Sequence, residues 1–128
     1  MKAGEVPRRY PLAGLGALEF REIGRGRQAD FGEWELVVSV ASLWELLLKK
    51  DKRDALVGDP LPWWESYVIK TDLPVLGIRQ NHVLALGRLP AIHRDPFDRI
   101  LVAQAIVEKV PLVSKDGELS KYGVQVLW

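Results

Sequence analysis

Residues 36–45 read Leu36-Val37-Val38-Ser39-Val40-Ala41-Ser42-Leu43-Trp44-Glu45. The first five form a β-branched run, which is typical of a strand buried on both faces of a sheet. Ser42 and Glu45 then have the S-x-x-E spacing of a capping box, and the apolar positions that follow end at Lys49 and Lys50, cations that suit a helix C-terminus. The stretch therefore predicts a buried strand that leads directly into a helix.

The rest of the chain after this stretch continues to alternate between extended and helical segments. Asp59-Pro60 and Asp95-Pro96 each place a capping acid before a first-turn proline, which marks two helix starts. Pro74 puts the next extended segment at the edge of a sheet, and Asp116-Gly117 forms a turn before one further helical turn. Helices are expected over residues 59–71, 80–89 and 95–106, and strands over residues 73–78, 110–114 and 124–128. This alternation predicts an α/β fold with a mainly parallel sheet and helices on both faces.

Composition excludes several classes of protein. The chain has 128 residues, a net charge of +1 and no cysteine, which excludes a disulfide scaffold, a thiolate nucleophile and a cysteine-ligated zinc site. The absence of cysteine suits a reducing compartment, so we expect a cytoplasmic protein. The longest nearly uncharged apolar run, residues 36–44, is far shorter than the ~20 residues that cross a bilayer, so no membrane partner is expected.

Common catalytic and cofactor motifs are also missing. No G-x-S-x-G or phosphate-binding G-x-x-x-x-G-K-[ST] segment occurs, so neither a serine triad nor a nucleotide cofactor is indicated. His82 and His93 lack the H-x₃₋₅-H spacing of paired metal ligands. For both histidines we expect a solvated or structurally hydrogen-bonded role.

Three acidic residues follow the ends of predicted strands or begin helices: Glu45, Asp98 and Asp116. Ligands bind beyond the carboxyl ends of parallel strands, so these acids are expected to converge if their strands are neighbours. Clustered carboxylates attract Mg²⁺ or Mn²⁺, which supports phosphodiester hydrolysis. Each acid also has a structural explanation, because Glu45 completes a capping box, Asp98 interacts with a helix dipole and Asp116 forms a turn.

Three basic residues adjoin these acids, namely Arg94, Arg99 and Lys115. Cations beside a carboxylate site are placed to hold a phosphate backbone, and solvated surface charge is the alternative explanation.

The combined motifs resemble one known family. The resemblance rests on residues 39–45, His93-Arg94-Asp95-Pro96-Phe97-Asp98-Arg99, Ala103-Gln104-Ala105 and Ser114-Lys115-Asp116. In their order and spacing, these segments are similar to the PIN-domain family, specifically the VapC-type toxins of bacterial toxin-antitoxin pairs. The resemblance implies a three-layer PIN-like fold and a Mg²⁺- or Mn²⁺-dependent endoribonuclease. It also implies that Glu45, Asp98 and Asp116 are catalytic residues that bind the metal ion or orient metal-bound water, and that Arg94 and Arg99 face RNA; Lys115 is the third RNA-binding candidate, from its place beside Asp116. A cognate antitoxin and a homodimer are the implied protein partners.

One part of the chain departs from this family. The family's first acid is an aspartate that ends an N-terminal strand in a context like L-D-T-H, and residues 1–34 contain no such segment. We therefore expect one domain over residues 1–128, with residues 35–128 as the family-like core and residues 1–34 as an atypical segment that lacks the N-terminal strand. Glu5 and Glu19 are poor substitutes for the missing aspartate.

Three explanations of residues 1–34 follow. They supply an unrelated strand that fills the centre of the sheet, or another chain satisfies a rearranged sheet, or the N-terminal coding segment has been replaced or frame-shifted. Two functions follow as well. The chain is a metal-dependent ribonuclease weakened by the loss of one acid, or it is an inactive PIN-like remnant that binds an antitoxin or RNA.

Overall fold

The computed structural model describes residues 11–13, 36–52 and 57–127. Within these residues, five short strands form one sheet in the order β3-β2-β1-β4-β5, and every pairing is parallel. The strands are β1 (Leu12–Ala13), β2 (Val37–Ser39), β3 (Val75–Leu76), β4 (Leu112–Val113) and β5 (Val126–Leu127). The helices are α2 (Val40–Lys49), α3 (Pro60–Trp64), the π-helical η2 (Glu65–Ile69), α4 (Gln80–Gly87), α5 (Pro96–Glu108) and the 3₁₀-helical η3 (Gly117–Tyr122). The predicted α/β class and parallel sheet are confirmed.

The central strand corrects one expectation. Residues 1–34 were expected to lack the N-terminal strand, yet β1 lies between β2 and β4 at the middle of the sheet. Leu12 N–H donates to the carbonyl of Pro111 at 2.8 Å, and Val37 N–H donates to the carbonyl of Pro11 at 3.0 Å. The first of the three explanations therefore fits the described residues, because a strand from this segment occupies the centre. Glu5 and Glu19 lie outside the described residues.

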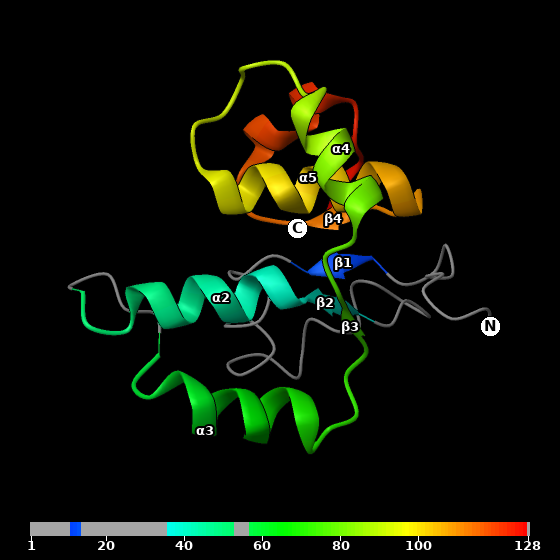
Figure 1. Cartoon of the computed structure of the whole chain (residues 1–128). Helices are drawn as coiled ribbons and strands as arrows, with labels where there is room; N and C mark the ends of the chain where they lie inside the picture. Colours follow the sequence, from blue (N-terminus) through cyan, green and yellow to red (C-terminus); the bar gives the residue numbers. More distant parts are fainter. Residues whose placement is uncertain (1–10, 14–35, 53–56, 128) are drawn as a thin grey trace.

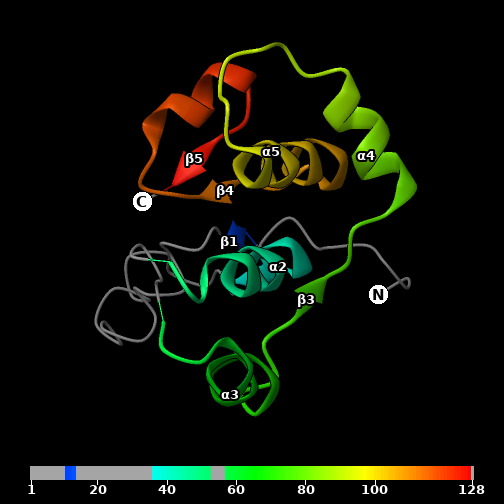
Figure 2. The same ribbon diagram turned by 60° about the vertical axis from the view of Figure 1, so that its left-hand side comes forward.

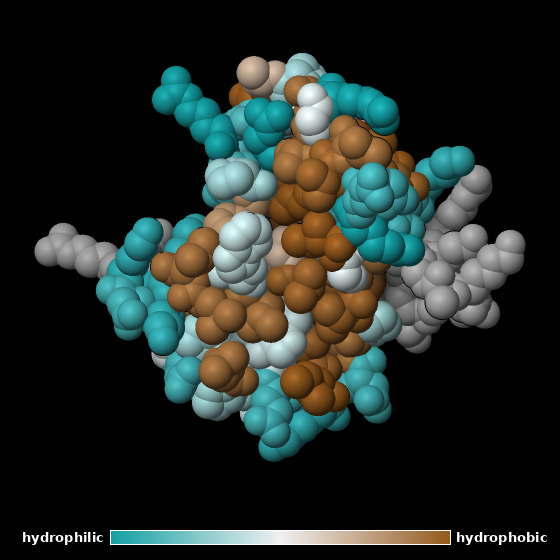
Figure 3. All heavy atoms as spheres, viewed as in Figure 1, coloured by the Kyte–Doolittle hydropathy of each residue, from teal (hydrophilic) through white to brown (hydrophobic). Residues whose placement is uncertain are grey.

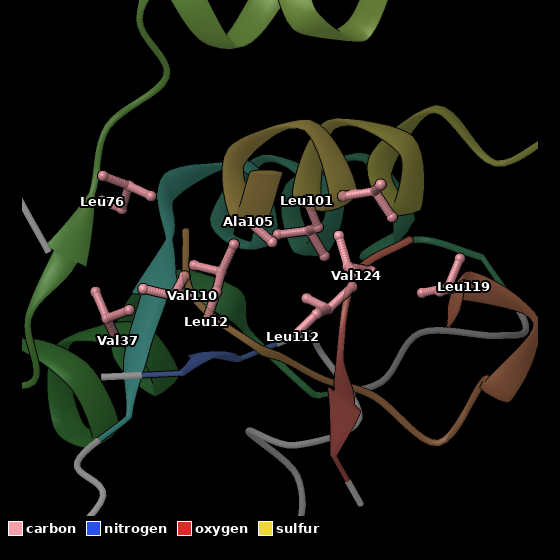
Figure 4. Packing of buried hydrophobic residues seen from close by; sticks show 10 residues of the cluster. Leu12, Val37, Leu76, Leu101, Ala105, Val110, Leu112, Leu119 and Val124 are labelled. Atoms are coloured by element: carbon pink, nitrogen blue, oxygen red, sulfur yellow. The ribbon is translucent and has the colours of Figure 1, made fainter. Parts of the chain in front are cut away.

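Helices cover both faces of the sheet (Figures 1 and 2). Side chains alternate along each strand, so that Ala13 and Val38 pack with Leu46 of α2, Trp64 of α3 and Val68 of η2. The opposite face packs against α5 and η3, and Figure 4 shows this second cluster from close by. Its labelled members include Leu12, Val37, Leu101, Leu112 and Leu119. The helix α4 packs on α5 outside this second layer.

The start of α2 differs from the prediction. The helix begins at Val40 and its N-cap is Ser39, whose Oγ accepts a hydrogen bond from Ala41 N–H at 3.0 Å. Ser42 therefore lies inside the helix and does not cap it, and the predicted capping box of Ser42 with Glu45 is wrong. The strand β2 ends at Ser39, one residue earlier than its apolar run suggested. Val40 suits a buried strand or a buried helix equally well, so the apolar run alone did not mark the boundary.

Other helix boundaries follow local chemistry as expected. Asp59 caps α3 by accepting from Leu61 N–H, and Asp95 caps α5 by accepting from Phe97 N–H at 2.8 Å. The strand β3 lies at the edge of the sheet, as Pro74 predicted. None of the helices in the described part of the chain has the length and apolar character needed to cross a membrane.

Replacing Leu12 by Ala tests the central strand. Leu12 is 0% exposed, so Leu12→Ala should lower the free energy of unfolding by about 3 kcal/mol through lost burial and the cavity it leaves. Leu61→Ala, which alters an exposed leucine on α3, is the matched control and should change it by no more than about 0.5 kcal/mol. Urea denaturation followed by circular dichroism measures both, and equal effects would place Leu12 outside the core.

Candidate functional site

Three titratable side chains meet beside the first turn of α5. His93 lies in the loop before the helix, Asp98 lies in its first turn, and Asp116 precedes η3. His93 Nε2 is 2.9 Å from Asp116 Oδ2 and 3.6 Å from Asp98 Oδ2. One potential ligand atom from each residue lies within 4.8 Å of the other two. We call these three residues the His-Asp-Asp cluster.

Helix starts hold the two aspartates in place. Asp95 accepts hydrogen bonds from the N–H groups of Phe97 and Asp98, which fixes the first turn of α5. Asp116 accepts from Glu118 N–H at 3.0 Å and so caps η3. The structural role expected for Asp116 is therefore confirmed, and the same residue also belongs to the cluster. Strand β4 ends three residues before Asp116, at the carboxyl edge of the sheet.

Glu45 lies close enough to influence this cluster but is not part of it. It is buried on α2, and its Oε2 accepts a hydrogen bond from Lys49 Nζ at 3.1 Å. Its charge is among those that raise the pKa of Asp98, so the two carboxylates interact electrostatically. Of the three predicted acids, the structure therefore brings Asp98 and Asp116 together and leaves Glu45 paired with a lysine beside them.

Asp98 carries the clearest electrostatic signal. Burial is the main cause that raises its pKa from 3.8 to about 6, and the negative charge of Asp95 is the next. Glu45 and Asp116 raise this pKa further, whereas His93 opposes the shift. An acid surrounded in this way by like charge is stabilised in its ionised form by a bound cation.

The donor set fits a divalent cation. Asp98 and Asp116 offer carboxylate oxygens, the ligands that Mg²⁺ and Mn²⁺ prefer, and Glu45 adds a third carboxylate nearby. Ser42 Oγ is buried and has no hydrogen-bond partner among the described residues; it lies three residues before Glu45 and so on the same side of α2. A buried hydroxyl without a protein partner is a group that water or an ion satisfies.

The predicted basic residues lie around this region. Arg94 and Lys115 are exposed, and Arg99 is half-buried on α5. Arg94 directly follows His93, and Lys115 directly precedes Asp116, so their positions along the chain bring them close to the cluster. No ion pair involves Arg94 or Arg99 within the described residues, which leaves both guanidinium groups available to an anion.

His93 is the cluster residue that sequence reasoning did not select. A structurally hydrogen-bonded role was expected for it, and such a role is confirmed, but its partner is one of the predicted site acids. The available signal was its position, two residues before the capping Asp95 and five before Asp98. His82, on α4, is also hydrogen-bonded as expected: its Nδ1 accepts from Arg79 N–H, and its Nε2 lies 2.9 Å from Oε1 of Glu108, the last residue of α5.

Comparisons with known proteins agree with this architecture. A family model described as the PIN domain matches residues 17–125, so the match extends upstream of the expected core boundary at residue 35. No curated protein sequence matches the chain.

Three similar solved structures are bacterial. The crystal structure of DNA-bound VapBC from Salmonella typhimurium has a TM-score of 0.70 at 15% identity and covers 92% of this chain and 96% of that chain. VapBC2 from Rickettsia felis, bound to a DNA fragment from its promoter, has a TM-score of 0.66 at 14% identity and covers 92% and 97%. FitAcB from Neisseria gonorrhoeae has a TM-score of 0.62 at 13% identity and covers 91% and 96%. At these identities the likeness establishes the fold.

The raised pKa of Asp98 predicts a pH-dependent effect of Asp98→Asn. A raised pKa favours the protonated acid in the folded chain, so its contribution to stability is full below pH 3.8 and is lost as pH rises through about 6. At pH 7.5 the ionised carboxylate therefore destabilises the fold and asparagine does not. Because the side chain is 29% exposed, solvent screening reduces the effect. Relative to the unsubstituted chain, we expect the free energy of unfolding of Asp98→Asn to increase by about 1 kcal/mol between pH 4.5 and 7.5.

Thermal melts in EDTA at pH 4.5 and pH 7.5 measure this gain. It corresponds to a rise of about 3 °C in the melting temperature of Asp98→Asn, relative to the unsubstituted chain, at pH 7.5. Asp51→Asn, on the exposed turn after α2, controls for the loss of one negative charge. A melting difference between Asp98→Asn and the unsubstituted chain that stays constant with pH would contradict the prediction.

Proposed function

The chain belongs to the PIN domain family, and from this premise we propose that it is a VapC-like toxin that hydrolyses RNA phosphodiester bonds with a divalent cation. The observation that carries the proposal is the convergence of Asp98 and Asp116 beside the first turn of α5, with Glu45 close enough to raise the pKa of Asp98.

Bound in such a site, Mg²⁺ or Mn²⁺ supplies charge neutralisation and activation of water for attack on phosphorus. Asp98 and Asp116 would hold the cation. Glu45 would orient water or complete the ligand set after its ion pair with Lys49 is exchanged. Arg94, Arg99 and Lys115 would contact the RNA phosphates.

The second candidate function is a binding protein without nuclease activity. A specific observation favours it, because Leu12 and Ala13 in the central strand offer no carboxylate between the strands that lead to Glu45 and to Asp116. A site with fewer carboxylates holds a divalent cation less tightly. In this case the same surface would bind an antitoxin or RNA and would not cut it.

For the toxin, we propose a cognate antitoxin as partner and the cytoplasm as the place of action. Two of the similar solved structures are VapBC structures with DNA, which supports a partner chain of that kind. RNA is the substrate that the family resemblance implies, and the basic side chains beside the cluster suit its backbone.

Calorimetric titration of Mn²⁺ into the purified chain tests the metal site. We expect saturable binding, weakened at least about tenfold in Asp98→Asn and in Asp116→Asn, because each removes a proposed ligand charge. Asp95→Asn is the matched control, since asparagine still caps α5 and the charge removed lies outside the cluster. It should retain affinity within about threefold.

Cleavage of a mixed RNA pool in Mn²⁺ then separates the two candidates. Cleavage that is lost in Asp98→Asn supports the nuclease. Saturable Mn²⁺ binding by a folded chain that cuts none of the RNAs favours the binding protein, and a folded chain that binds no Mn²⁺ excludes the metal-dependent mechanism.

We further propose that a second copy of this chain packs on an apolar surface formed by α2 and α4. The surface comprises Trp44, Leu48, Val83 and Leu84, each about half exposed. Figure 3 shows apolar side chains gathered over the face that carries these two helices. Both helices also contact α5 through one buried cluster around Ala41, so the surface rests on a rigid support.

The size and composition of this α2–α4 surface suit a homodimer. Its four side chains expose roughly 400 Å² of apolar area, which is within the range of functional patches and about half of what each partner buries in a stable interface. None of the four is charged, and interfaces between identical copies are the most apolar ones. Trp44 also contacts Phe97 edge to face, with ring centroids 5.2 Å apart, so the surface adjoins the turn that carries Asp98.

Leu84→Glu and Leu48→Glu test this dimer by burying a charge in its interface. Sedimentation equilibrium should show a dimer for the unsubstituted chain and at least about tenfold weaker association for both variants, because each buries an unpaired carboxylate. Leu61→Glu, which alters an exposed leucine on α3 outside the α2–α4 surface, should leave association unchanged. A monomeric unsubstituted chain would contradict the proposal and leave the surface to an antitoxin.

A further inference from the structure

The hydrogen bonds of His93 determine which of its nitrogens carries the proton. Asp95 N–H donates to His93 Nδ1 at 3.1 Å. A backbone N–H cannot accept, so Nδ1 must be unprotonated and the ring must carry its proton on Nε2. That proton faces the two carboxylates, with Asp116 Oδ2 at 2.9 Å and Asp98 Oδ2 at 3.6 Å.

From this geometry we propose that His93 is a positioning residue: it donates its Nε2 proton to Asp116 and does not bind the metal ion. The inference rests on the proposed metal site and assigns its ligands. A nitrogen that carries a proton has no lone pair for a metal, so the ion would be held by carboxylate oxygens alone.

Asp116 is held by this arrangement from two sides. Its Oδ2 faces His93 Nε2 and its Oδ1 accepts from Glu118 N–H, and each oxygen retains a second lone pair for an ion. Asp98, in contrast, accepts no hydrogen bond of normal length at its carboxylate in the described part of the chain. The cluster therefore combines one fixed carboxylate with one that is free to adjust to the cation.

His93 itself is anchored on three sides. Its backbone N–H donates to Tyr122 Oη at 2.7 Å, its Nδ1 accepts from the helix-capping Asp95, and its Nε2 bonds Asp116. Turning Nε2 into a metal ligand requires the proton to move to Nδ1, where it would oppose the N–H of Asp95. The anchoring of the ring therefore favours the donor role over the ligand role.

This assignment has a consequence for metal preference. A site made of carboxylate oxygens suits Mg²⁺ and Mn²⁺, whereas an imidazole ligand shifts the preference toward Zn²⁺. Loss of His93 should then weaken Mn²⁺ and Zn²⁺ binding by the same factor, because the imidazole touches neither ion.

The chain provides an internal reference for a spectroscopic test. It has only two histidines, and His82 has the same pattern of bonds. Arg79 N–H donates to His82 Nδ1 at 3.0 Å, and His82 Nε2 is 2.9 Å from Glu108 Oε1. His82 is fully buried and lies outside the His-Asp-Asp cluster, so metal ions should leave its signals unchanged.

Long-range ¹H–¹⁵N correlation spectra of the full-length labelled chain measure the proton positions in both rings. We expect both histidines to carry the proton on Nε2 without metal, and His93 to keep it when Mg²⁺ or the diamagnetic Cd²⁺ saturates the site. A His93 proton on Nδ1, with or without metal, would overturn the inference. Spectra in which Nε2 keeps its proton but no resonance responds to either ion would instead refute the metal site itself, and the positioning role with it.

Variants of His93 give a second readout by calorimetry. His93→Ala should weaken Mn²⁺ and Zn²⁺ binding about tenfold each, the usual cost of losing a group that orients a ligand. His93→Gln, whose amide N–H can replace the Nε2 donor, should restore both affinities to within about threefold. A selective loss of Zn²⁺ affinity in His93→Gln would identify His93 as a ligand and overturn the proposal.

Discussion

The backbone hydrogen bonds of β1 are the constraint on which the rest of the structure depends. Two residues, Leu12 and Ala13, lie between β2 and β4 and join the β3–β2 pair to the β4–β5 pair. Buried backbone groups must be paired, so without β1 the inner edges of β2 and β4 would be exposed in the middle of the molecule. Because β2 leads to Glu45 and β4 leads to Asp116, this short strand also sets the distance between the two sides of the candidate site.

The candidate site places several carboxylates at the starts of helices, although burial beside like charge disfavours the ionised form of one of them. Asp95 and Asp116 satisfy the free N–H groups of α5 and η3, and so they stabilise their own helix starts. Asp98 receives no comparable benefit, and burial among like charges raises its pKa to about 6. Capping therefore stabilises the starts of α5 and η3. The electrostatic repulsion falls mainly on the carboxylate of Asp98, and a bound cation would relieve it.

Local chemistry explains which features were predictable from the sequence. Asp59 and Asp95 act through neighbours two or three residues away, so their caps were predicted correctly, as was the turn at Asp116, which also caps η3. The S-x-x-E spacing predicted Ser42 as the cap of α2, but Ser39 caps it, and Ser39 Oγ also donates to Gln104 Oε1 at 2.6 Å, a tertiary contact 65 residues away. The strand β1 has two residues and no periodicity to detect, and its stability comes from its partners on both sides.

His82 and His93 show why the least predictable residues are those that act through distant partners. Both accept a backbone N–H at Nδ1 and both face a carboxylate with Nε2. In one case the carboxylate is Glu108, which also pairs with Arg79, so the bond joins α4 to α5. In the other it is Asp116 at the candidate metal centre. The same local chemistry thus serves packing in one place and orients a site residue in the other, and the difference depends only on where the carboxylate lies in the fold.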